Sequence, residues 1–169
     1  MGKMLMQKLW LLPCDCDGPV SDYVALSWEE LAAQIPKVTT FRVSRYALLP
    51  NASIQLHTFS DASEKAYGAC TYARCVDSSG IVRIQLLASA YRVAPLHKIT
   101  LTRLELCAAD IGAKRHSRIV QALEMPIASS HLWSDFAVTL QWLQAPPRTW
   151  KTIVANRVSE IQGLTHGAF

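Results

Sequence analysis

The sequence predicts a mixed α/β domain, because three successive strand-like segments are followed by a long helix, a short buried strand and two further helices. Apolar and polar side chains alternate over residues 54–61, and residues 66–76 and 81–93 are further strand candidates. The turn residues 77–80 separate the last two, so the three segments read as an antiparallel meander. A strand that returns after a long helix then indicates a mixed sheet with helices packed against it.

The helical part begins where the period of apolar residues changes. Residues 101–123 contain no proline, and at about 1.5 Å per residue they predict a helix of roughly 35 Å. Residues 131–135 predict a short buried strand, with Trp133 in the core. Residues 136–144 and 150–162 predict two more helices, separated by a pair of prolines.

The first part of the chain differs from the rest. Residues 3–12 and 28–34 predict two short helices, the second starting at the N-cap candidate Ser27 with a glutamate three residues on. This part is too interrupted to hold a core of its own. We therefore expect a leading segment, residues 1–51, and a main domain, residues 52–169.

Composition narrows the class of protein. Half of the 169 residues are hydrophobic and 18% are charged, which excludes a disordered tail. The net charge of +4 permits a nucleic-acid partner without demonstrating one. Because no run reaches roughly 18 apolar residues and no signal peptide is evident, we expect no membrane partner and an intracellular location, in cytoplasm or nucleus.

Three acidic residues occupy matching places in the predicted topology. Asp61 and Asp135 close the first and fourth strands, and Glu105 lies one turn into the long helix. If these two strands are neighbours, both aspartates emerge at one end of the sheet. Small residues on the stripe of Glu105, including Ala109 and Gly112, would let the helix approach the sheet closely.

An oxygen-rich cluster of this kind suits Mg²⁺ or Mn²⁺, since close carboxylates repel one another without a cation. A pair of such ions about 4 Å apart supports phosphodiester cleavage. The residues alone also allow the alternative that these acids form no metal site. An aspartate at a strand end is commonly a turn or cap residue, and a helical glutamate is commonly solvated.

Other enzyme classes fit less well. An aspartic protease needs a glycine that Asp61-Ala62-Ser63 lacks, and the sequence has neither a nucleophile elbow nor a phosphate-binding glycine loop. Integrases share the sheet and the acids, but their glutamate comes last, whereas the order here is Asp, Glu, Asp.

Four blocks follow one another along the sequence: FSDASEKAYGAC (59–70), TRLELCAA (102–109), WSD (133–135) and WKTIVANRVSEI (150–161). Taken together and in this order, they resemble the ribonuclease H region of Pao/BEL-type retrotransposon polyproteins. In front of them, KMLMQKLW (3–10) resembles the segment that joins the reverse transcriptase to ribonuclease H.

The resemblance implies a ribonuclease H-like fold and metal-dependent hydrolysis of RNA in RNA–DNA hybrids. Asp61, Glu105 and Asp135 would be the catalytic residues and the ligands of two Mg²⁺ or Mn²⁺ ions, and no other cofactor is expected. The expected partners are the hybrid and the reverse transcriptase part of the parent polyprotein.

Basic residues on the later helices are candidates for contacts to the phosphates of the hybrid. Solvated helix faces are the alternative for each of them. They are Lys114, Arg115, Arg118, Arg148, Lys151 and Arg157.

The sequence departs from the family in two places. Phe136 follows the third acid where the family usually has a small polar residue. The family fold continues into a fifth strand and a segment bearing a fourth metal-binding aspartate, and the sequence ends at residues 165–169 before either. We therefore expect a C-terminally truncated domain. The alternative function is a catalytically inactive remnant with at most nucleic-acid or protein binding.

Overall fold

The computed structural model describes residues 2–12, 15, 17–42, 46–49 and 51–165. The end of the sequence at residues 166–169, where we expected the truncation, lies outside the described residues. The chain divides into two compact units, Met1–Arg45 and Tyr46–Phe169, and each is described by itself. None of the described helices is long and apolar enough to cross a membrane.

The N-terminal unit is a pair of helices, α1 (Gly2–Leu9) and α2 (Asp22–Val38), which bury Leu5 and Val24. The predicted start of the second helix at Ser27 was wrong, because α2 begins after Ser21. Ser27 lies inside the helix, where the apolar period already includes the buried Val24.

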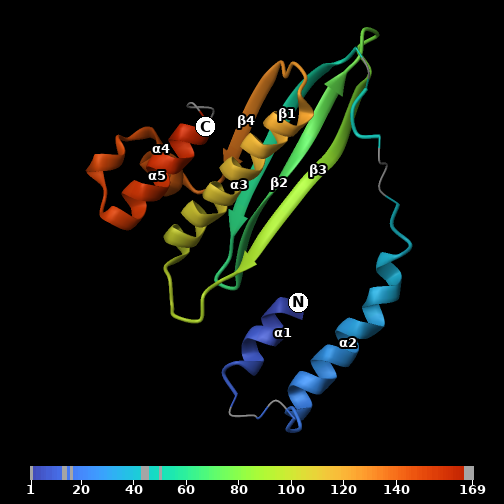
Figure 1. The fold of residues 1–169 in the computed structure, drawn as a ribbon, viewed down its shortest axis with the longest axis vertical. Helices are drawn as coiled ribbons and strands as arrows, with labels where there is room; N and C mark the ends of the chain where they lie inside the picture. The colour runs from blue at the N-terminus through green and yellow to red at the C-terminus, as the bar shows by residue number, and fades with distance from the viewer. Residues whose placement is uncertain (1, 13–14, 16, 43–45, 50, 166–169) are drawn as a thin grey trace. The chain divides into compact units, whose positions relative to one another are not determined.

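The second unit contains a four-stranded sheet of order β3-β2-β1-β4 (Figure 1). Its strands are β1 (Ser53–Ala62), β2 (Ala66–Val76), β3 (Val82–Val93) and β4 (Ser129–Ser134). Strands β1, β2 and β3 form the predicted antiparallel meander, whereas β4 pairs with β1 in parallel. The mixed sheet predicted from the sequence is therefore confirmed.

One face of this sheet is covered by the long helix α3 (Leu101–Leu123), which also packs against the last helix, α5 (Thr152–Thr165) (Figure 1). After β4 come α4 (Ala137–Gln144), a short 3₁₀ helix (Pro147–Thr149) and α5 (Thr152–Thr165). Two clusters of buried side chains hold these layers together. One joins α3, β4, α4 and α5 through residues that include Leu106, Leu143 and Val158, and the other joins β1 and β2 through Leu56 and Ala73.

The alternation of side chains decides which face each strand residue occupies. Leu56 and Thr58 face α3 and are 0% and 1% exposed, as the pattern predicted. The prediction that Trp133 lies in the core was wrong, because its indole is 48% exposed. Leu132 takes the buried position in β4, so the next residue must project from the opposite face.

A buried polar network links α3 to the sheet beneath it. Nδ1 of His116 lies 3.1 Å from the hydroxyl of Thr58, which lies 2.9 Å from the hydroxyl of Thr71. All three residues are at most 4% exposed. Burial lowers the pKa of His116 below its ordinary value, so this imidazole is neutral in the fold.

This burial predicts a loss of stability in mild acid. Because the folded-state pKa of His116 is depressed, the unfolded chain binds the proton first, and stability falls as pH decreases from about 6.5 towards the lowered pKa. One such proton changes the free energy of unfolding by at most about 1.4 kcal/mol per pH unit. We expect urea unfolding of His116→Gln to show a flatter pH dependence than wild type between pH 7.5 and 5. Parallel curves would contradict this assignment.

Candidate metal centre

The sheet positions two of the three predicted acids. Ser60 of β1 pairs with Ser134 of β4 in the parallel register, so Asp61 and Asp135 follow at the same end of neighbouring strands. Both carboxylates are exposed to solvent. This placement is the one that the topology required if the first and fourth strands were neighbours.

Helix α3 supplies the third acid from the face beneath the sheet. Ala108, Ala109 and Ala113 are all 0% exposed, and Gly112 packs directly against β1. A Cβ atom on Gly112 would lie 3.3 Å from the methyl group of Thr58. The small residues therefore bring the helix close enough for the side chain of Glu105 to reach the strand ends.

The structure brings Asp61, Glu105 and Asp135 together. One carboxylate oxygen from each residue lies within 4.8 Å of the others. Glu105 is 3% exposed, whereas the two aspartates face solvent. The arrangement is thus a half-open site, with one buried acid at its base and two acids at its mouth.

The electrostatics of the site disfavour three negative charges without a counter-ion. Burial raises the pKa of Glu105, the charges of Asp61 and Asp135 raise it further, and the backbone N–H of Ala62 acts in the opposite direction. Oε2 of Glu105 is buried and has no hydrogen-bond partner among the described residues. A divalent cation fits this donor set, because it would supply both the missing partner and the missing positive charge.

Two of the predicted phosphate-binding residues take part in ion pairs. The buried Asp110 accepts hydrogen bonds from Lys114 Nζ (3.0 Å) and Arg157 Nη1 (2.9 Å), and Lys114 also pairs with Glu160 at 2.9 Å. Partial burial opposes the charge of Lys114, but the hydrogen bonds to Glu160 and Asp110 raise its pKa overall. This network ties α3 to α5.

Sequence reasoning missed that network. The spacing of Asp110 and Lys114 by four residues was a signal for one helical ion pair. The contact to Arg157 depends on how α5 packs against α3, which local sequence does not specify.

The other four predicted basic residues belong to α3, to the 3₁₀ helix and to the residue in front of α5. Arg115 and the exposed Arg118 belong to the second half of α3. Arg148 lies in the 3₁₀ helix, and Lys151 immediately precedes α5; both are exposed. Within the described part of the chain, none of the four forms an ion pair.

The chain aligns with solved ribonucleases H at low identity. RNase H1 from the halophilic archaeon Halobacterium salinarum NRC-1 is 12% identical, with a TM-score of 0.38 over 68% of this chain and 78% of that chain. The N-terminal RNase H domain of Rv2228c from Mycobacterium tuberculosis is 13% identical, with a TM-score of 0.39 over 68% and 76%. LC11-RNase H1 in complex with an RNA/DNA hybrid is 12% identical, with a TM-score of 0.40 over 69% and 78%.

Comparison with models of sequence families shows the family of this chain, which the structural matches at 12–13% identity do not. No curated protein matches the sequence. A family model described as "Pao retrotransposon-like RNaseH-like domain" matches residues 1–136, a range that includes all three acids of the site. The family resemblance is thereby confirmed over the first three sequence blocks, the fourth (residues 150–161) lying outside the match, and the chain belongs to the Pao retrotransposon-like RNaseH-like domain family.

Proposed function

We propose that this domain hydrolyses the RNA strand of RNA–DNA hybrids with the help of divalent cations held by Asp61, Glu105 and Asp135. The observation that carries the proposal is that one oxygen of each of these carboxylates lies within 4.8 Å of the others, while Oε2 of Glu105 is buried and has no hydrogen-bond partner in the described part of the chain. Membership in an RNaseH-like family supports it. LC11-RNase H1, whose structure contains an RNA/DNA hybrid, gives the substrate class a precedent.

The buried acid and the two exposed acids have different tasks in this proposal. Bound Mg²⁺ or Mn²⁺ would activate a water molecule and stabilise the leaving oxygen of a phosphodiester. Glu105 would hold a cation from the buried side, where a positive charge would offset the cost of ionising this carboxyl group. Asp61 and Asp135 would hold it from the solvent side, at the end of β1 and β4 that a phosphodiester can reach.

The test combines cation binding with cleavage. Calorimetric titration of Mn²⁺ into the full chain should show binding, and gel analysis should show cleavage of the RNA strand in a hybrid, with double-stranded DNA intact and activity lost in EDTA. Mn²⁺ binding without any cleavage of the RNA strand would contradict the proposed hydrolytic activity. It would favour the alternative, an inactive remnant that binds nucleic acid or protein.

The ion pairs indicate which basic residues of α3 are available to contact phosphate groups. Arg118 is exposed and outside the ion pairs of the described residues, whereas Lys114 is held by Asp110 and Glu160. We expect Arg118→Ala to weaken hybrid binding at every sequence and to lower the slope of log K against log salt by about one. Lys114→Ala is the matched comparison and should change the slope less. Hybrid titrations in EDTA at several salt concentrations measure both, and a larger change at Lys114 would reverse the ranking.

We also propose that the N-terminal unit contacts the reverse transcriptase part of a parent polyprotein. Large apolar side chains are exposed on this unit, including Trp10 at 84% and Phe41 at 76%. Such side chains favour a protein contact. Co-purification of a reverse transcriptase segment with the wild-type chain, but not with Trp10→Ser, is the expected result. Equal recovery of both would contradict the proposal.

A further inference from the structure

The sheet face opposite α3 is rich in aromatic side chains. We call it the outer face, and its residues are His57 and Phe59 of β1, Tyr72 and Arg74 of β2, Ile84 of β3, and His131 and Trp133 of β4. Several of these side chains are strongly exposed, with Phe59 at 45%, Trp133 at 48% and Ile84 at 61%. The metal centre uses none of them.

The rings on β1 and β4 lie nearly parallel to one another. The rings of His57 and His131 stack with centroids 5.0 Å apart and an interplanar angle of 17°. Trp133 is inclined by only 14° to His57 and 13° to Phe59, at 6.2 Å from each. The parallel register places His57 opposite His131 and Phe59 opposite Trp133, so the backbone fixes this alignment.

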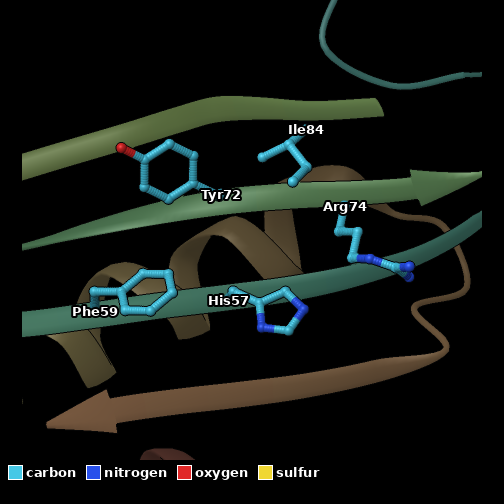
Figure 2. A pocket seen from close by; sticks show the side chains of 5 residues that line it. All are labelled: His57, Phe59, Tyr72, Arg74 and Ile84. Carbon is cyan, nitrogen blue, oxygen red and sulfur yellow. The ribbon is translucent and has the colours of Figure 1, made fainter. Parts of the chain in front are cut away.

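Beside these rings lies a cavity of about 350 Å³. It is lined by His57, Phe59, Tyr72, Arg74 and Ile84, which project from three neighbouring strands on the same face (Figure 2). Phe59 and Tyr72 meet edge to face, at 6.1 Å and 75°. The volume is within the range of small-molecule pockets, and its walls are largely ring surfaces.

The polar groups at the cavity indicate which chemical groups a ligand would carry. Trp133 donates its indole N–H to Nδ1 of His57 at 3.3 Å, which leaves the proton of the neutral imidazole on Nε2. That Nε2 is buried and has no hydrogen-bond partner among the described residues. Arg74, which donates to Gln55 at 2.8 Å, supplies the positive charge, and none of the lining residues is acidic.

We propose that this cavity on the outer face binds an unpaired base of a single-stranded nucleic acid. A base offers a flat ring for stacking, and the phosphate of the same nucleotide suits the guanidinium group of Arg74. The bases of a duplex are already stacked and paired, so the ligand is a single strand and not the hybrid. The inference goes beyond the proposed cleavage and does not require a cation.

Strand β1 connects the cavity with the acidic cluster. Phe59 lies two residues before Asp61, a separation of roughly 7 Å along an extended strand. A nucleic acid whose single-stranded end occupies the outer face could therefore place its adjoining duplex near the strand ends. The cavity would then hold an overhang beside the site of cleavage.

The experiment measures fluorescence anisotropy of a labelled single-stranded oligonucleotide with the full chain in EDTA, so that cleavage cannot contribute. Phe59→Leu keeps the apolar bulk and removes the ring, and we expect it to weaken binding roughly 5-fold or more. Trp28→Leu is the matched control, because Trp28 is 50% exposed in the other unit. We expect it to bind as wild type does. Equal binding by both variants would overturn the proposal.

Two further measurements separate stacking from charge. Arg74→Gln should lower the salt slope of binding by about 0.7, the value for one phosphate contact on a single strand, whereas Phe59→Leu should leave the slope unchanged. Tyr72→Leu repeats the loss of a ring from β2 if Phe59→Leu does not fold. An abasic oligonucleotide that competes as well as the normal strand would overturn the role of the base.

The remaining outcomes identify other occupants of the face. Binding of adenosine monophosphate without binding of the oligonucleotide would replace the strand by a mononucleotide. A dimer in sedimentation experiments that Phe59→Leu dissociates would replace the nucleic acid by a second copy of the chain. Either result overturns the proposal.

Discussion

The Asp61→Asn variant is expected to cleave an RNA–DNA hybrid at least about 10³-fold more slowly than the wild-type chain, which corresponds to roughly 4 kcal/mol of transition-state stabilisation. The substitution keeps the size of the side chain and removes its charge. It leaves Glu105 and Asp135 with one cation ligand fewer at the end of β1. Initial rates at saturating Mn²⁺ measure the effect. Asp17→Asn, an exposed aspartate of the other unit, is the matched control and should retain activity.

The same variant should have the opposite effect on stability when no cation is bound. The charge of Asp61 contributes to the raised pKa of Glu105, so its removal relieves repulsion within the cluster. We expect a melting temperature roughly 2 °C above wild type in EDTA, and a smaller gain than wild type on addition of Mg²⁺. A lower melting temperature in EDTA would show that the loss of activity reflects damage to the fold.

Replacement of Gly68 by alanine is expected to reduce the free energy of unfolding by about 3 kcal/mol. Gly68 lies in β2 between Asp61 of β1 and Tyr91 of β3. A Cβ atom there would lie 2.5 Å from the backbone oxygen of Ala90 and 2.9 Å from Cβ of Tyr91. Because the first of these atoms belongs to the backbone, β3 must shift before the methyl group can fit.

Gly163 provides the matched control for this substitution. It lies within α5, and nothing lies within 4 Å of the position that its Cβ would occupy. Gly163→Ala should stabilise the chain by up to about 1 kcal/mol, because alanine favours the helix and restricts the unfolded chain. Urea unfolding of both variants measures the contrast. Similar effects from the two substitutions would contradict the steric explanation for Gly68.

Local patterns were sufficient to predict most of the second unit. The bounds of β2 and α3 match the predicted ranges to the residue, because alternation and helical period are properties of the segments themselves. The sequence brought the three acids together only on the condition that the first and fourth strands are neighbours, and the parallel pairing of β4 with β1 meets that condition.

Features that depend on packing between segments were not predicted. Trp133 was assigned to the core as part of a short buried strand, whereas in the structure Leu132 takes the buried position and Trp133 projects from the opposite face. The salt bridge between Asp110 and Arg157 arises from the docking of α5 on α3, and neither helix encodes it separately. The row of parallel rings on the outer face likewise depends on which strand lies beside β1.

The parallel pairing of β4 with β1 also determines the order in which the domain can assemble. The β1–β2–β3 meander needs contacts only between neighbours in sequence, whereas β4 must return across α3 before it can pair. Closing that long loop costs more entropy than closing a hairpin, so we expect the β1–β4 contact to form late. Asp135 arrives with it, directly after β4. A nascent chain would therefore carry no complete cluster of the three acids until most of the domain has been synthesised and the sheet has closed.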